Sequence, residues 1–117
     1  MKTTFQQDVI DVVLQIPKGR VTSYGTIAKF LGHNRGARMV GWVMNNCHVI
    51  NAERNTQNQK EIPAHRVVNR NGSLTGRFHF ETPTTMQELL EAENIEIRDH
   101  QIQDFSNVFW NPQLELL

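Results

Sequence analysis

Cysteine is almost absent from this chain of 117 residues, in which Cys47 is the only one. A single thiol excludes an internal disulfide and a zinc site built from several cysteines. The five histidines include no pair at i, i+4 spacing, so the sequence offers no ligand set for a metal. We therefore expect a domain that folds by hydrophobic burial alone, without a metal or another cofactor.

Long hydrophobic runs are also missing. No apolar stretch approaches the roughly 20 residues that a membrane-spanning helix needs. Residues 1–16 lack the basic start and apolar centre of a signal peptide. The length is typical of one domain, residues 1–117. We expect a cytoplasmic monomer that makes no contact with a membrane.

The chain lacks a net charge, because 12 basic side chains balance 12 acidic ones. The two signs are nevertheless segregated along the chain. Residues 12–80 hold ten basic and two acidic side chains, whereas residues 81–117 hold one basic and eight acidic ones. A basic body of this kind attracts a polyanion such as DNA. A solvated surface whose two halves attract each other would show the same pattern.

Apolar periodicity predicts three helices in the first half of the chain. They cover residues 4–16, residues 24–31 with Ser23 as the cap, and residues 34–46 with Asn34 as the cap. The second and third of these helices are joined by a short turn that contains glycine. This is the spacing of a helix-turn-helix unit.

The third predicted helix has two distinct faces. One face is apolar and is made of Met39, Val40, Val43 and Met44. The other face is basic, aromatic and amide-bearing, and contains Arg35, Arg38, Gly41, Trp42 and Asn45. Such a face suits a DNA groove, and a glycine there lets another molecule approach the backbone closely. A solvated helix over an ordinary core would have the same two faces.

Residues 51–61 are rich in amides and have no apolar period, so we expect an exposed loop. A short strand is predicted over residues 65–68. Asn71 and Gly72 then form a typical hairpin turn, after which Leu74 begins the return.

The last third of the chain predicts one more helix, a small hairpin and a packed tail. Thr82 can cap a helix over residues 83–94, whose apolar stripe is Met86, Leu89 and Leu90. Apolar residues alternate about an Asp-His turn in residues 95–102, which indicates a hairpin. The tail beyond it is rich in aromatic side chains, and we expect it to pack on the domain as a clasp.

The pair His65 and Arg66, directly after Pro63 and Ala64, has two interpretations. The histidine could be a general base beside a positive charge, or an ordinary structural histidine. Ala64 itself can do no chemistry.

Four segments, in this order, resemble the DNA-binding domain of the O6-alkylguanine-DNA alkyltransferases. They are SYGTIA (23–28), GARMVGWVM (36–44), PAHRVVNRNGSLTG (63–76) and an acidic helix that ends near Glu93. The resemblance implies a mostly α fold with a small β-hairpin, similar to a winged helix-turn-helix. It covers a core of about residues 4–94, and residues 95–117 would form the C-terminal clasp.

In that family a cysteine at the position of Ala64 takes the alkyl group from a flipped guanine. With alanine there, the chain resembles the alkyltransferase-like proteins, which keep the fold and lose the nucleophile. No catalytic residue is therefore expected. His65 and Glu93 match the family's histidine and glutamate relay, and we expect them to remain as hydrogen-bonding groups. Most alkyltransferase-like proteins carry tryptophan at this position, so Ala64 implies a roomier pocket.

The resemblance also implies how lesion-bearing DNA is held. Tyr24 would push on a phosphate and touch the flipped base, and Arg38 would enter the duplex and occupy the gap that the base leaves. The backbone carbonyls of Ala64 and Val67 would accept hydrogen bonds from the guanine amino group. The pocket wall would include Arg77 and Phe78, and the DNA-facing helix surface would include Gly41, Trp42 and Asn45.

The leading hypothesis is a non-enzymatic sensor that binds double-stranded DNA, flips O6-alkylguanine into a pocket and holds it. The resemblance implies that the complex then flags the lesion for nucleotide excision repair. One alternative is a methyltransferase whose nucleophile has moved to Cys47, at the end of the third helix, where the helix dipole disfavours a thiolate. Another is a plain helix-turn-helix regulator, which would leave residues 63–76 unexplained. The family's hinge asparagine falls on Asn46 or Cys47.

Overall fold

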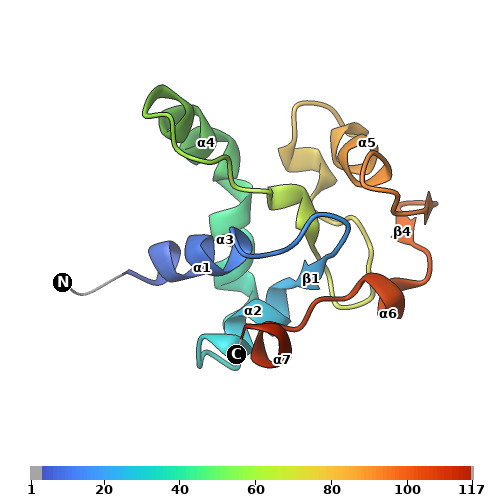
Figure 1. Cartoon of the computed structure of the whole chain (residues 1–117), viewed down its shortest axis with the longest axis horizontal. Helices are drawn as coiled ribbons and strands as arrows, with labels where there is room; N and C mark the ends of the chain where they lie inside the picture. The colour runs from blue at the N-terminus through green and yellow to red at the C-terminus, as the bar shows by residue number, and fades with distance from the viewer. Residues whose placement is uncertain (1–3, 117) are drawn as a thin grey trace.

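The computed structural model of the chain describes residues 4–116, and four helices make up its first half (Figure 1). They are α1 (Phe5–Val13), α2 (Tyr24–Phe30), α3 (Ala37–Asn45) and α4 (Cys47–Thr56). The hydroxyl of Ser23 caps α2 as predicted, by accepting a hydrogen bond from the N–H of Thr26 at 3.1 Å. The prediction that Asn34 caps the third helix is wrong. A turn closed by the N–H of Gly36 on the carbonyl of His33 occupies this segment, so α3 begins only at residue 37.

The first hydrophobic core lies between α1, α2 and α3. It buries an apolar stripe from each helix and also the start of α4, the segment before residue 68 and Trp110. On α3 the predicted apolar face is confirmed for Val40, Val43 and Met44, but Met39 is 47% exposed. The buried stripe of this short helix continues to Cys47 instead, because residues at i, i+3, i+4 and i+7 share one face. Each buried aliphatic side chain contributes about 1.5–3 kcal/mol of transfer free energy.

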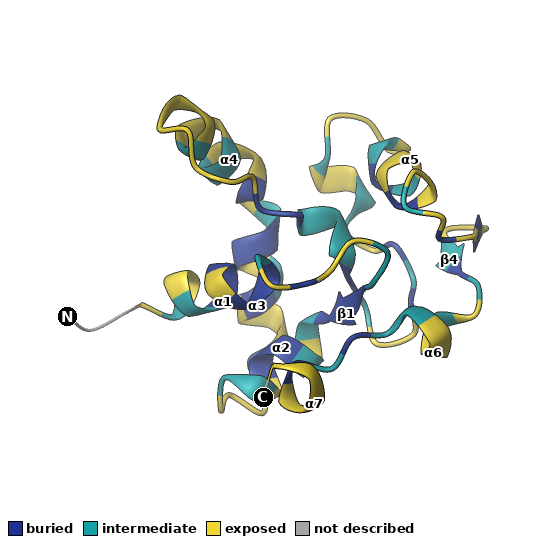
Figure 2. Ribbon diagram, viewed as in Figure 1, coloured by how far each residue is buried: buried dark blue, intermediate teal, exposed yellow. Residues whose placement is uncertain are grey.

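The predicted loop over residues 51–61 is wrong for its first part, because α4 continues to Thr56. Two tertiary contacts hold this helix. The Asn51 amide donates to the carbonyl of Ile62 at 3.1 Å and accepts from its N–H at 2.7 Å. Arg54 donates to the carbonyl of Lys60 at 2.7 Å. Most of α4 is exposed, and it projects from the rest of the fold (Figure 2).

The predicted strand over residues 65–68 forms only in part. A 3-10 helix, η1 (Ala64–Arg66), comes first, and β2 (Val67–Val68) then pairs in parallel with β1 (Thr22–Ser23). The turn around Gly72 forms with a φ of +81°, as predicted. Its return does not pair with β2, so the predicted hairpin is absent from this described part of the chain. Ser73 forms a bridge to Gln101 instead.

The second half of the chain builds a second core. Its elements are η2 (Arg77–His79), α5 (Thr85–Glu91), β3 (Ile97–Arg98) and β4 (Gln101–Ile102). The hairpin of β3 and β4 turns at Asp99 and His100 as predicted. The helix α5 begins two residues later than predicted, because the Thr82 hydroxyl lies in a turn with Thr84 and Thr85. Leu89 is 40% exposed, so only part of the predicted stripe is buried.

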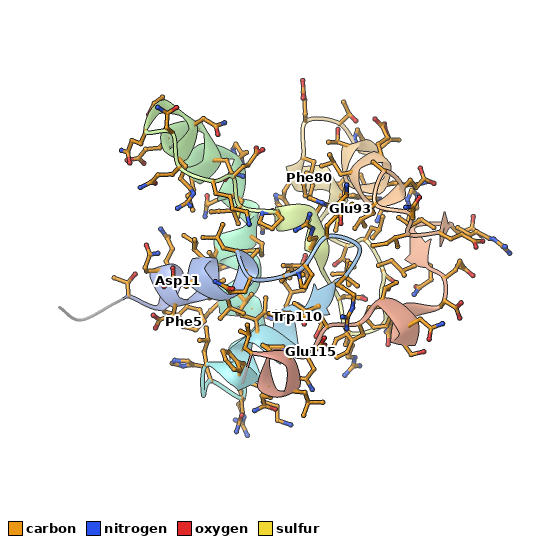
Figure 3. All side chains as sticks on the ribbon, viewed as in Figure 1. Phe5, Asp11, Phe80, Glu93, Trp110 and Glu115 are labelled. Carbon is orange, nitrogen blue, oxygen red and sulfur yellow. The ribbon has the colours of Figure 1, made fainter. Side chains whose placement is uncertain are left out.

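The tail, with α6 (Phe105–Val108) and α7 (Pro112–Glu115), packs on the domain, as expected of the clasp. Trp110 is 2% exposed and belongs to the first core. Its N–H donates to the carbonyl of Val21 at 2.7 Å. Arg20 donates to both carboxylate oxygens of Glu115, at 2.9 and 3.0 Å. Figure 3 shows Glu115 on α7 and near Trp110. No helix within residues 4–116 is long and apolar enough to cross a membrane.

Candidate nucleic-acid interface

The carboxylate of Glu93 joins three segments of the chain beside Ala64. It accepts hydrogen bonds from Nε2 of His65 at 2.6 Å, from the guanidinium of Arg66 at 3.0 Å and from the N–H of Gly19 at 2.7 Å. Figure 3 shows Glu93 at this junction, on the α5 side of the molecule. The expected contact between His65 and Glu93 is present. The sequence did not predict that Arg66 belongs to this network. Its guanidinium also donates to the carbonyl of Ile16 at 2.9 Å.

The network fixes the protonation states of its members. Burial opposes ionisation of Glu93, but hydrogen bonds from Arg66, Gly19 and His65 outweigh it and lower the pKa of the carboxyl to about 2. Burial lowers the pKa of His65 and outweighs the opposing effect of the Glu93 carboxylate. At neutral pH Glu93 is therefore ionised and His65 is neutral. The proton of His65 must lie on Nε2, and Nδ1 is left as an acceptor.

A cavity of about 560 Å³ lies over Ala64, a size typical of small-molecule sites. One wall comes from α3 and α4, the floor from η1 and the segment before it, and the far wall from the end of η2, the start of α5 and the segment between them. Representative lining residues are Met44, Cys47, Ile62, Ala64, Phe80 and Leu89. The methyl group of Ala64 takes up little of this space.

A smaller groove of about 200 Å³ lies between α3 and η2. Its lining consists of Tyr24, Gly41 and Asn45 on one side and Thr75, Gly76 and His79 on the other. A Cβ atom added to Gly76 would lie 2.8 Å from the Tyr24 hydroxyl, so the tyrosine reaches across the groove. Burial raises the pKa of Tyr24, which stays neutral. Three of the predicted DNA-contacting residues therefore meet at this groove.

The other predicted residues of α3 point to solvent. Arg38 is exposed, and the side chain of Trp42 is 66% exposed. The backbone carbonyl of Trp42 accepts a hydrogen bond from the Asn46 side-chain amide at 2.9 Å. An exposed arginine and an exposed indole on one helix are available to a partner molecule.

The expected wall residues of η2 differ from those found. Neither Arg77 nor Phe78 lines the cavity or the groove. The guanidinium of Arg77 instead stacks on the Phe78 ring at 4.5 Å and donates to the carbonyl of Leu74 at 2.9 Å. His79 takes the expected place, because residues i and i+3 of a 3-10 turn lie on one side and His79 follows Gly76 by three. Sequence reasoning missed it, since the turn type was not predicted.

The carbonyls expected to receive the guanine amino group are only partly free. That of Ala64 already accepts a hydrogen bond from the N–H of Val67, and one lone pair remains. Val67 is 1% exposed.

The prediction that Cys47 lies at the end of the third helix is wrong, because Cys47 is the first residue of α4. A helix N-terminus favours a thiolate, yet burial raises the pKa of this thiol to about 11, and the thiol donates to the carbonyl of Val43 at 3.6 Å. The side chain of Asn51 links α4 to the segment before Pro63 through the backbone of Ile62, a contact that the sequence did not predict. No group of three His, Cys, Asp or Glu residues between positions 4 and 116 is arranged to hold a metal ion.

Comparison with known proteins identifies relatives along nearly the whole chain. The family described as "6-O-methylguanine DNA methyltransferase, DNA binding domain" matches residues 4–95. Alkyltransferase-like protein 1 of Schizosaccharomyces pombe is 30% identical over 112 residues, which is 92% of this chain and 95% of the relative. The DNA base-flipping protein of Escherichia coli is 43% identical over 75 residues, and the match spans 51% of its length.

Solved structures share the fold. S. pombe Atl1 in complex with damaged DNA containing O6-carboxymethylguanine superposes with a TM-score of 0.74 at 29% identity, over 96% of this chain and all of that one. Mycobacterium tuberculosis OGT in complex with DNA gives a TM-score of 0.56 at 31% identity, over 80% of this chain and 51% of that one. The mostly helical fold predicted from the sequence is confirmed.

Proposed function

The chain belongs to the family of 6-O-methylguanine DNA methyltransferase DNA-binding domains, as an alkyltransferase-like member, and from this premise we propose that it senses DNA damage without repairing it. In this proposal it binds duplex DNA, extrudes O6-alkylguanine and holds the base. The observation that carries the proposal is that two features lie together at η1. An intact network of His65, Arg66 and Glu93 lies beside a cavity whose floor, at Ala64, has no nucleophile.

The helix-turn-helix of α2 and α3 supplies the DNA contacts of the proposal. Arg38 and Trp42 are exposed on α3, and Tyr24 begins α2. Extruding a base costs a few kcal/mol of lost stacking, and the planar guanidinium of Arg38 can refill the gap. Gly41 has no atom within 4 Å of an added Cβ, which leaves room for the DNA backbone. The groove between α3 and η2 would then receive the extruded base, and the cavity over Ala64 its alkyl group.

The residue at the cavity floor, Ala64, explains why the protein would hold the lesion without accepting its alkyl group. Dealkylation needs a thiolate that attacks the alkyl carbon, and an alanine methyl group has no lone pair. The one thiol of the chain, Cys47, has a pKa of about 11. Only about one molecule in ten thousand carries it as a thiolate at pH 7. The proposal therefore assigns no catalytic residue, and the held lesion would be passed to nucleotide excision repair.

The test compares a short duplex that carries one O6-methylguanine with its unmodified twin, at low and at high salt. Phosphate contacts weaken equally for both duplexes as salt rises, so a lesion preference that survives high salt supports recognition of the base. Equal, salt-sensitive binding, or a preference for one undamaged sequence, would overturn the proposal. Intact-mass measurement of the protein after incubation with the O6-methylguanine duplex checks the proposed absence of alkyl transfer. A gain of one methyl group would mean that the protein is an enzyme.

A further inference from the structure

Trp42 holds most of its indole in solvent. It is 66% exposed on α3, whereas the other tryptophan, Trp110, is 2% exposed in the first core. Within residues 4–116 the ring of Trp42 joins no aromatic pair, and the cation–π pair found there is Arg77 with Phe78. The indole is the largest apolar side chain, so its exposed area is buried only when another molecule lies on it.

The surroundings of Trp42 favour DNA as that molecule. Arg38, which is also exposed, lies one helical turn earlier on the same face of α3, where Cβ atoms are about 5–6 Å apart. Gly41 lets a partner come close to the helix, because an added Cβ there would have no atom within 4 Å. The sequence holds no acidic residue between Asp11 and Glu53, so this stretch attracts phosphates.

We propose that Trp42 is a wedge that enters the minor groove beside Arg38 and partly unstacks a base step next to the flipped guanine. This inference rests on the proposed function, because it takes α3 as the helix that faces the DNA. Proteins of the minor groove insert apolar side chains between base steps and bend the duplex in this way. The two side chains would divide the work, since the guanidinium refills a gap and the indole opens a neighbouring step.

A wedge makes the affinity depend on the sequence that flanks the lesion. Pyrimidine–purine steps such as TA unstack at low cost, whereas A-tracts are stiff. The protein would therefore bind the same lesion more tightly beside a TA step than within an A-tract. This preference would come from Trp42 and not from a hydrogen bond to a base edge.

Intrinsic fluorescence tests whether the indole contacts the bases. Aromatic side chains stack on exposed base faces, and a stacked indole loses its emission. We expect the emission of the wild type to fall when a duplex with one O6-methylguanine is added. The variant Trp42→Phe retains only Trp110, which is buried in the first core, and its emission should stay constant. An equal fall in both proteins, or none in either, overturns the inference.

Fluorescence anisotropy tests whether the indole acts as a wedge. It gives the Kd for two O6-methylguanine duplexes that differ only in the step beside the lesion, TA or A-tract. Trp42→Ala should weaken binding to the TA duplex by roughly tenfold and abolish the difference between the duplexes. Trp42→Phe should restore part of it. Met39→Ala, which shortens another exposed apolar side chain of α3, is the matched control and should behave like the wild type.

The result against the inference is a Trp42→Ala variant that keeps the wild-type ratio of the two Kd values and the wild-type unfolding curve. The indole would then be free for a protein partner instead. Failure of the proposed function looks different. In that case the wild type would bind the lesion duplex no more tightly than its unmodified twin, while quenching by both duplexes would still report the contact of Trp42 with DNA.

Discussion

Nε2 of His65 lies 2.6 Å from Oε2 of Glu93, and the same carboxylate also binds the N–H of Gly19. In a chain without a nucleophile at position 64, this contact has no proton to relay. It ties the end of α5 to η1 and to the segment that precedes β1. The network is therefore best understood as the structural support of the site.

Replacing Glu93 with glutamine should lower the free energy of unfolding by about 3 kcal/mol, because the change leaves the Arg66 guanidinium without its countercharge in a mostly buried place. Urea unfolding measures the loss. The matched control is Glu96→Gln, whose partner Arg98 is 72% exposed. An exposed pair of that kind contributes about 0–1 kcal/mol. Equal losses in the two variants would show that the network does not stabilise the fold.

Stability should fall in acid, and Glu93 should account for part of the fall. Its pKa is about 2 in the folded chain against an ordinary value of 4.5, so the unfolded state binds more protons as pH drops through this range. The lowered pKa of His65 adds a loss that begins near pH 6.5. Urea unfolding at a series of pH values tests this. The Glu93→Gln variant should lose less stability than the wild type below about pH 4.5, and parallel curves would contradict the assignment.

Arg38→Ala should weaken binding to a duplex with O6-methylguanine by about 10- to 100-fold, because no planar cation refills the stack. The fold should be unaffected, since Arg38 is exposed and makes no ion pair within residues 4–116. Fluorescence anisotropy gives the affinity. Arg98→Ala, which removes an equal charge from the acidic segment, serves as the control. Equal affinities of the two variants would count against insertion of Arg38.

Ala64→Trp should reduce the affinity for duplexes with a large O6 substituent while binding to unmodified duplex stays the same. The indole would occupy a substantial part of the cavity of about 560 Å³. Ala64→Ser, which adds one oxygen atom, is the control. Titrations with O6-benzylguanine and unmodified duplexes measure the effect. If Ala64→Trp binds the large adduct as tightly as the wild type does, the substituent does not enter this cavity.

Local sequence signals predicted local structure well. Ser23 caps α2 because its hydroxyl satisfies a backbone N–H within three residues, and the Asp-His turn of β3 and β4 depends on two adjacent residues only. The residues that resemble the family predicted the helical fold and the contact of His65 with Glu93. These features depend on short-range chemistry or on a distinctive motif.

Long-range contacts decided the features that the sequence did not predict. The amide-rich start of residues 51–61 is helical because Asn51 binds the backbone of Ile62 from across the loop. Residues 67 and 68 pair with β1 rather than with the nearer return strand. The position of His79 depends on a 3-10 turn that no residue pattern predicted.

The burial of Trp110 has a consequence for how the protein is made. Within residues 4–116, this side chain completes a core whose other buried members all lie before residue 68. During synthesis the helix-turn-helix therefore emerges from the ribosome many residues ahead of its last core side chain, and contacts of such high sequence separation form slowly. A nascent chain that stops before residue 110 exposes the apolar surface that Trp110 covers. Productive folding thus waits until Trp110 has left the ribosome, and a product that stops before this residue would be a substrate for chaperones and proteases.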